Sequence, residues 1–175
     1  MNGWKRIFLL TFTLVFAYQL GFSQKITKEF RTFYTGFQRN IEADHLAALK
    51  EVLYFPFQTS YWIDGMNAFS DEEKADGLIQ AEDFDQYGSR IFNADVKRLV
   101  SEMDVTRVQQ IDLEASGDYY KRLGQQVDRG TTLLELYCQY GEESTVGEHY
   151  FAFVFGKVNS EYRVLAYYTS ERVKQ

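Results

Sequence analysis

The chain has 175 residues, of which 45% are hydrophobic, 17% aromatic and 25% charged. This is enough apolar material for one globular core, and the composition is too aromatic for a disordered chain and too polar for a membrane bundle. The formal net charge of −6 argues against nucleic acid as a partner, because phosphate binding needs clustered lysines and arginines. One cysteine and two histidines are too few for a structural zinc site, so we expect neither a metal nor a cofactor.

Residues 1–23 have the pattern of a secretory signal peptide. Lys5 and Arg6 precede an apolar run of about 16 residues, and small residues stand before an expected cleavage point at Gln24. The run is shorter than the roughly 20 residues that a membrane-spanning helix needs. We therefore expect an exported protein, periplasmic or secreted, without stable membrane insertion after cleavage. Residues 24–175 are expected to form a single domain.

The only cysteine, Cys138, leaves an exported domain without an internal disulfide. Its stability must then come from the core. Cys138 falls in a strand-like run, and we interpret it as a small buried hydrophobe rather than a reactive thiol.

The first part of the mature chain has helical periodicity. Apolar residues recur every three or four positions from Ile26 to Ile41, which predicts a helix facing the core. Asp44 is expected to cap a second helix with its apolar face at Leu46–Leu53, ending before Pro56. The two helices are predicted to form a hairpin.

The next segments alternate between short strands and helices. Residues Gln58–Asp64 are rich in strand-forming side chains, and Gly77–Gln80 is a second short candidate strand. A helical stripe runs from Phe84 to Phe92. Asn93 is expected to cap a further helix that extends to Met103.

After Asp104 the period changes to two, which predicts strands. Three of them, joined in part by a turn at Asn159-Ser160, are expected to form an antiparallel meander: Leu134–Tyr140, Glu148–Lys157 and Glu161–Thr169. In the third, the pattern places Tyr162, Val164, Ala166 and Tyr168 on one face. The stretch 105–128 is less regular, with candidate strands at Val108–Leu113 and Tyr119–Leu123.

Helices followed by a meander predict an α+β domain in which N-terminal helices pack on a curved antiparallel sheet. Several segments resemble exported bacterial proteins of the nuclear transport factor 2-like, or cystatin-like, fold: Phe30-Phe33-Phe37, Leu46–Phe57, Glu82–Asn93 and the closing hairpin rich in Phe and Tyr. The resemblance implies a cone-like, half-open sheet with a pocket between sheet and helices. It also implies a homodimer formed through the sheet.

Five aromatic residues are candidates for lining a ligand pocket: Tyr61, Trp62, Tyr87, Tyr137 and Tyr150. The alternative is that these side chains belong to the core, as many must in a chain so rich in aromatic residues.

Asp64 and His149 are the candidate catalytic groups. A carboxylate among aromatic side chains can have a raised pKa, and a neutral imidazole beside an apolar cavity can move protons near neutral pH. Isomerases and dehydratases of the resembling fold use an Asp, His or Tyr in the cone. We favour the other interpretation, in which Asp64-Gly65 is an ordinary turn and His149 lies at an exposed strand end.

Two functions follow from these patterns. The first is a non-catalytic binding domain that holds a small apolar or mixed ligand, or a partner chain, on an aromatic concave face. The alternative is a cofactor-free isomerase or dehydratase with Asp64 or His149 as the base. No phosphate-binding glycine loop, nucleophile elbow or metalloprotease helix is found, which favours the first.

Overall fold

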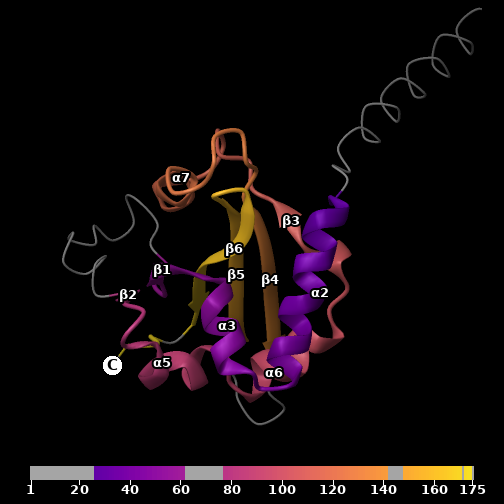
Figure 1. Ribbon diagram of the computed structural model, residues 1–175, viewed down its shortest axis with the longest axis vertical. Coiled ribbons are helices and arrows are strands. Elements are labelled where there is room, and N and C mark those ends of the chain that lie inside the picture. Colours follow the sequence, from indigo (N-terminus) through magenta and orange to yellow (C-terminus); the bar gives the residue numbers. More distant parts are fainter. Residues whose placement is uncertain (1–25, 62–76, 142–147, 171, 175) are drawn as a thin grey trace, which may run out of the picture.

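The computed structural model describes residues 26–61, 77–141, 148–170 and 172–174 (Figure 1). The helices are α2 (Lys28–Glu42), α3 (Leu46–Val52), α5 (Phe84–Ile91), α6 (Ala94–Glu102), α7 (Asp118–Gly124) and the short 3-10 helix η2 (Val105–Arg107). The strands are β1 (Leu53–Gln58), β2 (Leu78–Ile79), β3 (Gln109–Gln110), β4 (Leu134–Gly141), β5 (Glu148–Val158) and β6 (Glu161–Thr169). The expected signal peptide, Trp62 and Asp64 lie outside the described residues.

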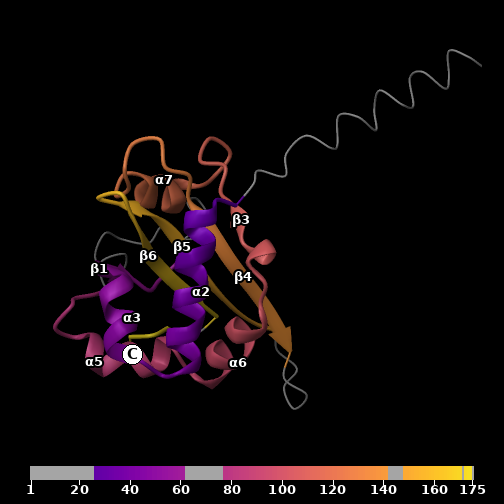
Figure 2. The ribbon, with the colours of Figure 1, turned by 45° about the vertical axis from the view of Figure 1, so that its right-hand side comes forward.

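One sheet contains all six of these strands, in the order β2-β1-β6-β5-β4-β3. Strands β4, β5 and β6 form the predicted antiparallel meander. β1 runs parallel to β6, so the sheet is mixed. We predicted a purely antiparallel sheet, which is wrong in this respect. The predicted α+β class, with N-terminal helices packed on a curved sheet, is confirmed (Figure 2). No helix of the described ranges is long and apolar enough to cross a membrane.

The main core lies between α2 and the inner face of the sheet. Thr27 begins α2 by accepting a hydrogen bond from the Phe30 amide over 3.1 Å, and the apolar stripe from Phe30 to Ile41 is buried. On β5, Phe151, Phe153 and Phe155 share the inner face, as the alternation predicts. Aromatic rings therefore fill the concave space in which we expected a ligand.

A second, smaller core covers the outer face of the sheet. Tyr119 and Leu123 of α7 pack there on the outward residues of β5 and β6. We predicted a strand at Tyr119–Leu123, which is wrong. The spacing of four residues between these two side chains puts both on one side of a helix, with Asp118 and Arg122 placed favourably for the helix dipole.

Strand β6 contains a bulge that changes which side chains face inward. Val154 pairs with Ala166 while Phe155 pairs with Val164, so Leu165 is an extra residue in β6. As a result Val164 packs in the main core, whereas Ala166 and Tyr168 pack in the outer one. The predicted single face from Tyr162 to Tyr168 is therefore wrong beyond Val164.

Two further predictions need correction near the second helix. β1 begins at Leu53, within the expected helical face, and ends at Gln58, where we expected a strand to begin. Asp44 does not cap α3. It has a left-handed backbone with φ of 55°, and its carboxylate forms a 2.8 Å ion pair with Lys97. The residue before α3 is His45, whose side chain makes no capping hydrogen bond.

Other local predictions are confirmed. The short strand within Gly77–Gln80 is β2, and the helical stripe from Phe84 is α5. Asn93 caps α6, accepting a hydrogen bond from the Val96 amide over 3.0 Å. Within 105–128, only β3 and the helices η2 and α7 form.

Candidate functional site

A cleft of about 250 Å³ opens where α2 begins, between this helix, the start of β4 and the β5–β6 hairpin. We call it the mouth cleft. It lies at the edge of the main core, beside the start of α2. Its lining comprises Ile26, Thr27, Gln110, Gly130, Thr131, Thr132, Leu134, Lys157 and Tyr162.

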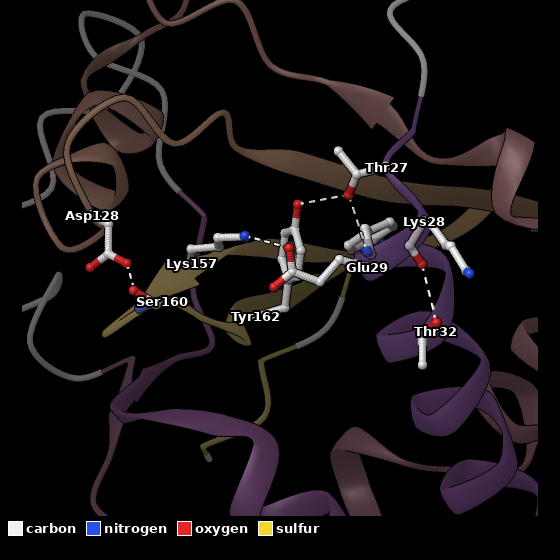
Figure 3. A network of polar contacts seen from close by, with 9 residues as sticks. Thr27, Lys28, Glu29, Thr32, Asp128, Lys157, Ser160 and Tyr162 are labelled. Atoms are coloured by element: carbon white, nitrogen blue, oxygen red, sulfur yellow. Dashed lines mark hydrogen bonds and ion pairs between the residues drawn. The ribbon is translucent and has the colours of Figure 1, made fainter.

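The polar groups of the mouth cleft are arranged around the ring of Tyr162 (Figure 3). The Tyr162 hydroxyl lies 3.3 Å from Thr27 Oγ1, and the Lys157 ammonium lies 5.0 Å from the ring centroid. The ring also packs edge-on against Phe30, with centroids 5.1 Å apart. Tyr162 is therefore held between the core and the cleft.

The charge of Lys157 is balanced within the site. Its ammonium donates to Glu29 Oε2 over 2.6 Å, and this hydrogen bond raises the pKa of Lys157. Because the pair is neutral overall, hydroxyl and amide groups remain the main polar contacts that the cleft offers to a ligand.

Asp128 fixes the turn of the β5–β6 hairpin, which contributes Lys157 and Tyr162 to the cleft. Its carboxylate accepts the backbone N–H groups of Asn159 and Ser160 over 2.9 and 2.6 Å (Figure 3). Both turn residues have left-handed backbones, with φ of 53° and 66°, as the predicted hairpin turn requires. The Asp128 carbonyl accepts from the Thr131 amide, which ties this part of the lining to the hairpin.

Hydroxyl, amide and apolar groups predominate in the lining of the mouth cleft. Its described lining contains no His, Cys, Asp or Glu, and its one cation is held by Glu29. Hydroxyl groups beside apolar Ile26 and Leu134 are typical of a site for a mixed polar and apolar molecule.

Three of the tyrosines predicted to bind a ligand come together elsewhere, on the outer face of the sheet. Tyr61 stacks on Tyr168 with ring centroids 4.7 Å apart, Tyr150 lies 6.3 Å from Tyr168, and Tyr137 stacks on Tyr150 at 5.9 Å. We call this group the tyrosine face. It lies on the side of the sheet away from α2, where Tyr61 and Tyr150 pack against the outer core.

The other predicted residues are separate from this group. Tyr87 lies on α5, half-buried against the main core, with the Arg90 guanidinium 5.9 Å from its ring. His149 lies at the end of the β4–β5 pair and stacks on Tyr140 with centroids 5.7 Å apart. It does not line the mouth cleft.

Glu135, which sequence reasoning missed, organises part of the tyrosine face. The hydroxyls of Tyr120 and Tyr168 donate to the same oxygen, Glu135 Oε1, over 2.6 and 2.7 Å. Burial, with the nearby carboxylate, raises the pKa of both tyrosines far above the ordinary value. The alternation of β4 placed Glu135 on the outward face, but the helix that covers it was not predicted.

Comparisons with known proteins assign no family to the chain. No family model matches it, and no curated protein matches it. Among solved structures, the chain has a distant likeness to the beta subunit of the benzoate 1,2-dioxygenase from Burkholderia mallei ATCC 23344. The two share 10% sequence identity with a TM-score of 0.38, over 83% of this chain and 91% of that one. A likeness of this degree assigns neither a family nor an activity.

Proposed function

We propose that the protein is an exported, non-catalytic binding domain that holds a small molecule of mixed polar and apolar character in the mouth cleft. The observation that carries the proposal is the set of hydroxyls and one neutralised cation around Tyr162, in a cleft between α2 and the sheet. Export is supported by the signal-peptide pattern of residues 1–23.

The size and polarity of the cleft narrow the class of ligand. Drug-sized ligands typically occupy pockets of roughly 300 to 1,000 Å³, so a cleft of about 250 Å³ favours a smaller molecule. An uncharged molecule with hydroxyl or amide groups fits best, because the Lys157–Glu29 pair already satisfies its own charges.

The test is a thermal-shift and calorimetric screen of the mature protein against small neutral polyols, monosaccharides, amides and small anions. A ligand of the mouth cleft should bind Tyr162→Phe about 2- to 12-fold more weakly than the native protein, as one net hydrogen bond predicts. Tyr54→Phe is the matched control, because Tyr54 is a half-buried tyrosine that packs against the outer core.

Two results would contradict the proposal. One is the absence of any binding specific to the cleft: either no neutral compound binds, or every compound that binds has the same affinity for native protein and for Tyr162→Phe. The other is conversion of a compound to product that is lost on changing Asp64 or His149, which would establish the enzyme instead.

A further inference from the structure

A second hollow, of about 450 Å³, lies at the other end of β6 from the mouth cleft. It is formed by the end of α5, the residue that caps α6, and the chain that follows β6. Its walls carry Ser89, Arg90, Asn93, Thr169 and Arg172. The buried residues Tyr167 and Val173 also contribute to the lining and supply an apolar base. We call it the arginine hollow.

The arginine hollow concentrates positive charge in an acidic chain. Six lysines or arginines elsewhere are neutralised by carboxylates, as in Lys50–Asp85 and Lys97–Asp44. Within the described parts of the chain, no carboxylate forms an ion pair with Arg90 or Arg172. The formal charge of the whole chain is −6, so two such guanidinium groups beside one hollow are a marked local contrast.

Arg90 is held in place by the protein. Its Nη1 donates to the Val173 carbonyl over 3.0 Å, and its guanidinium lies over the Tyr87 ring. An arginine has five N–H donors, so this single bond leaves others for a ligand. A guanidinium fixed in this way loses little conformational entropy when it binds an anion.

The helix that begins beside the hollow adds to its preference for negative charge. α6 runs for nine residues from Ala94, and its capping residue Asn93 lines the hollow. The amino end of a helix has a partial positive charge, which favours a nearby anion. Ser89 provides a hydroxyl on the same side.

We infer that the arginine hollow binds an organic anion, with its carboxylate, sulfonate or phosphate group at Arg90 and Arg172 and a small apolar body against Tyr167 and Val173. The volume leaves room for an anion attached to a small organic group. The inference does not depend on the mouth cleft, because the two sites share no residue.

The test uses two fluorescent probes with closely related aromatic bodies. 1-Anilinonaphthalene-8-sulfonate is an anion, and N-phenyl-1-naphthylamine is the same framework without the sulfonate. We expect the first to bind the native protein at least about tenfold more tightly than the second, as a charge-assisted hydrogen bond predicts. Phenylacetate and phenyl phosphate should displace the anionic probe, and benzyl alcohol should not. Stronger displacement by phenylacetate would indicate a carboxylate site, and stronger displacement by phenyl phosphate would indicate a phosphate site.

Variants assign the binding to the hollow. Arg172→Gln should weaken binding of the anionic probe about tenfold. Arg129→Gln removes the same charge at an exposed residue outside the arginine hollow, and it should change the affinity less than about twofold. Arg90→Gln should behave like Arg172→Gln. Arg90 also donates to the carbonyl of Val173, so the melting temperature of the Arg90→Gln variant must be measured as well. Arg172→Gln is therefore the decisive variant.

Equal binding of the two probes, or native affinity in Arg172→Gln, would overturn the inference. Loss of anionic-probe binding in Tyr162→Phe but not in Arg172→Gln would also overturn it, by assigning the anion to the mouth cleft. Failure of the screen for neutral ligands would affect only the proposed function.

Discussion

The ring of Phe37 on α2 meets the ring of Phe153 on β5 edge to face, with centroids 5.3 Å apart and planes 79° apart. Phe153 is fully buried and also stacks on Phe92, with centroids 5.9 Å apart. It thus joins the long helix, the sheet and the segment that leads into α6. Such pairs add about 0.5 to 1.5 kcal/mol each beyond the burial of area.

Phe153→Ala should lower the free energy of unfolding by about 3 to 5 kcal/mol, because the substitution removes buried apolar surface and leaves a cavity. Chemical denaturation of native protein and variant measures the change. The control is Tyr137→Ala, at a tyrosine that is 42% exposed, for which we expect a smaller loss. Equal midpoints for native protein and Phe153→Ala would contradict the packing of the inner face.

Alkaline pH should destabilise the domain through the buried tyrosines. Burial raises the pKa of Tyr168 and Tyr119 well above 10, the ordinary value that the unfolded chain retains. Above about pH 10 the unfolded state therefore holds fewer protons than the folded state, and stability falls as pH rises. Each such tyrosine lowers the unfolding free energy by up to about 1.4 kcal/mol per pH unit.

Urea denaturation between pH 8 and pH 11 checks this prediction. The contribution of these tyrosines to the unfolding free energy should be nearly constant at pH values below about 10, the pKa of tyrosine in the unfolded chain. Above that pH it should fall. Tyr168→Phe removes one of the titrating groups, so the slope above pH 10 should become shallower. An unchanged slope in that variant would show that Tyr168 titrates normally in the folded state.

Cys138 should be unreactive toward thiol reagents in the folded protein. Its side chain is buried in β4, and burial raises the pKa of its thiol, so the reactive thiolate is scarce and inaccessible. Reaction with 5,5′-dithiobis(2-nitrobenzoate) should be slow in buffer and should release one equivalent of thiolate after unfolding in urea. Fast reaction in buffer would place the thiol at the surface.

Export should yield a mature chain that begins near Gln24. The charged start, the short apolar run and the small residues before this position predict cleavage there. Intact-mass analysis of protein from the periplasmic or secreted fraction measures the N-terminus directly. Retention of Met1, or a membrane fraction that resists salt and carbonate washing, would contradict the signal peptide.

A homodimer through the sheet, implied by the resemblance, stays a prediction. If it forms on the outer face, Tyr137 is the residue to change, because it is a large, exposed side chain of that face. Tyr137→Arg should then shift the mass measured by light scattering from dimer to monomer. Lys121→Glu, on the exposed side of α7, serves as the surface control. A native monomer would contradict the prediction outright.

Local patterns in the sequence predicted the elements that depend on a single segment. The stripe of α2, the Asn93 cap and the alternation of β5 each follow from residues close together in the chain. The bulge at Leu165 could not be predicted in this way, because it exists only relative to the register of β5. The short helix α7 was missed for a related reason, since a few apolar residues fit either a helix or a strand.

The candidate site was predicted less well than the fold. Tyr137 and Tyr150 were correctly placed on strands, but both faces of the sheet are covered by apolar side chains, so the pattern did not tell the inner face from the outer one. The mouth cleft has no local signal at all. Its ion pair joins Glu29 to Lys157, which are 128 positions apart in the chain.

The extra residue in β6 has a consequence for how this strand can tolerate insertions and deletions. Beyond Leu165 the two neighbours Tyr167 and Tyr168 face opposite ways, the first toward the phenylalanine core and the second toward Glu135. Deletion of Leu165 itself would leave both directions as they are, because the residues after it already pair in regular register with β5. Deletion of Ala166 with the bulge kept would instead turn Tyr167 outward and Tyr168 inward, because each later residue would move to the neighbouring pair. We therefore expect β6 to tolerate the loss of a residue at the bulge better than the loss of a residue beside it.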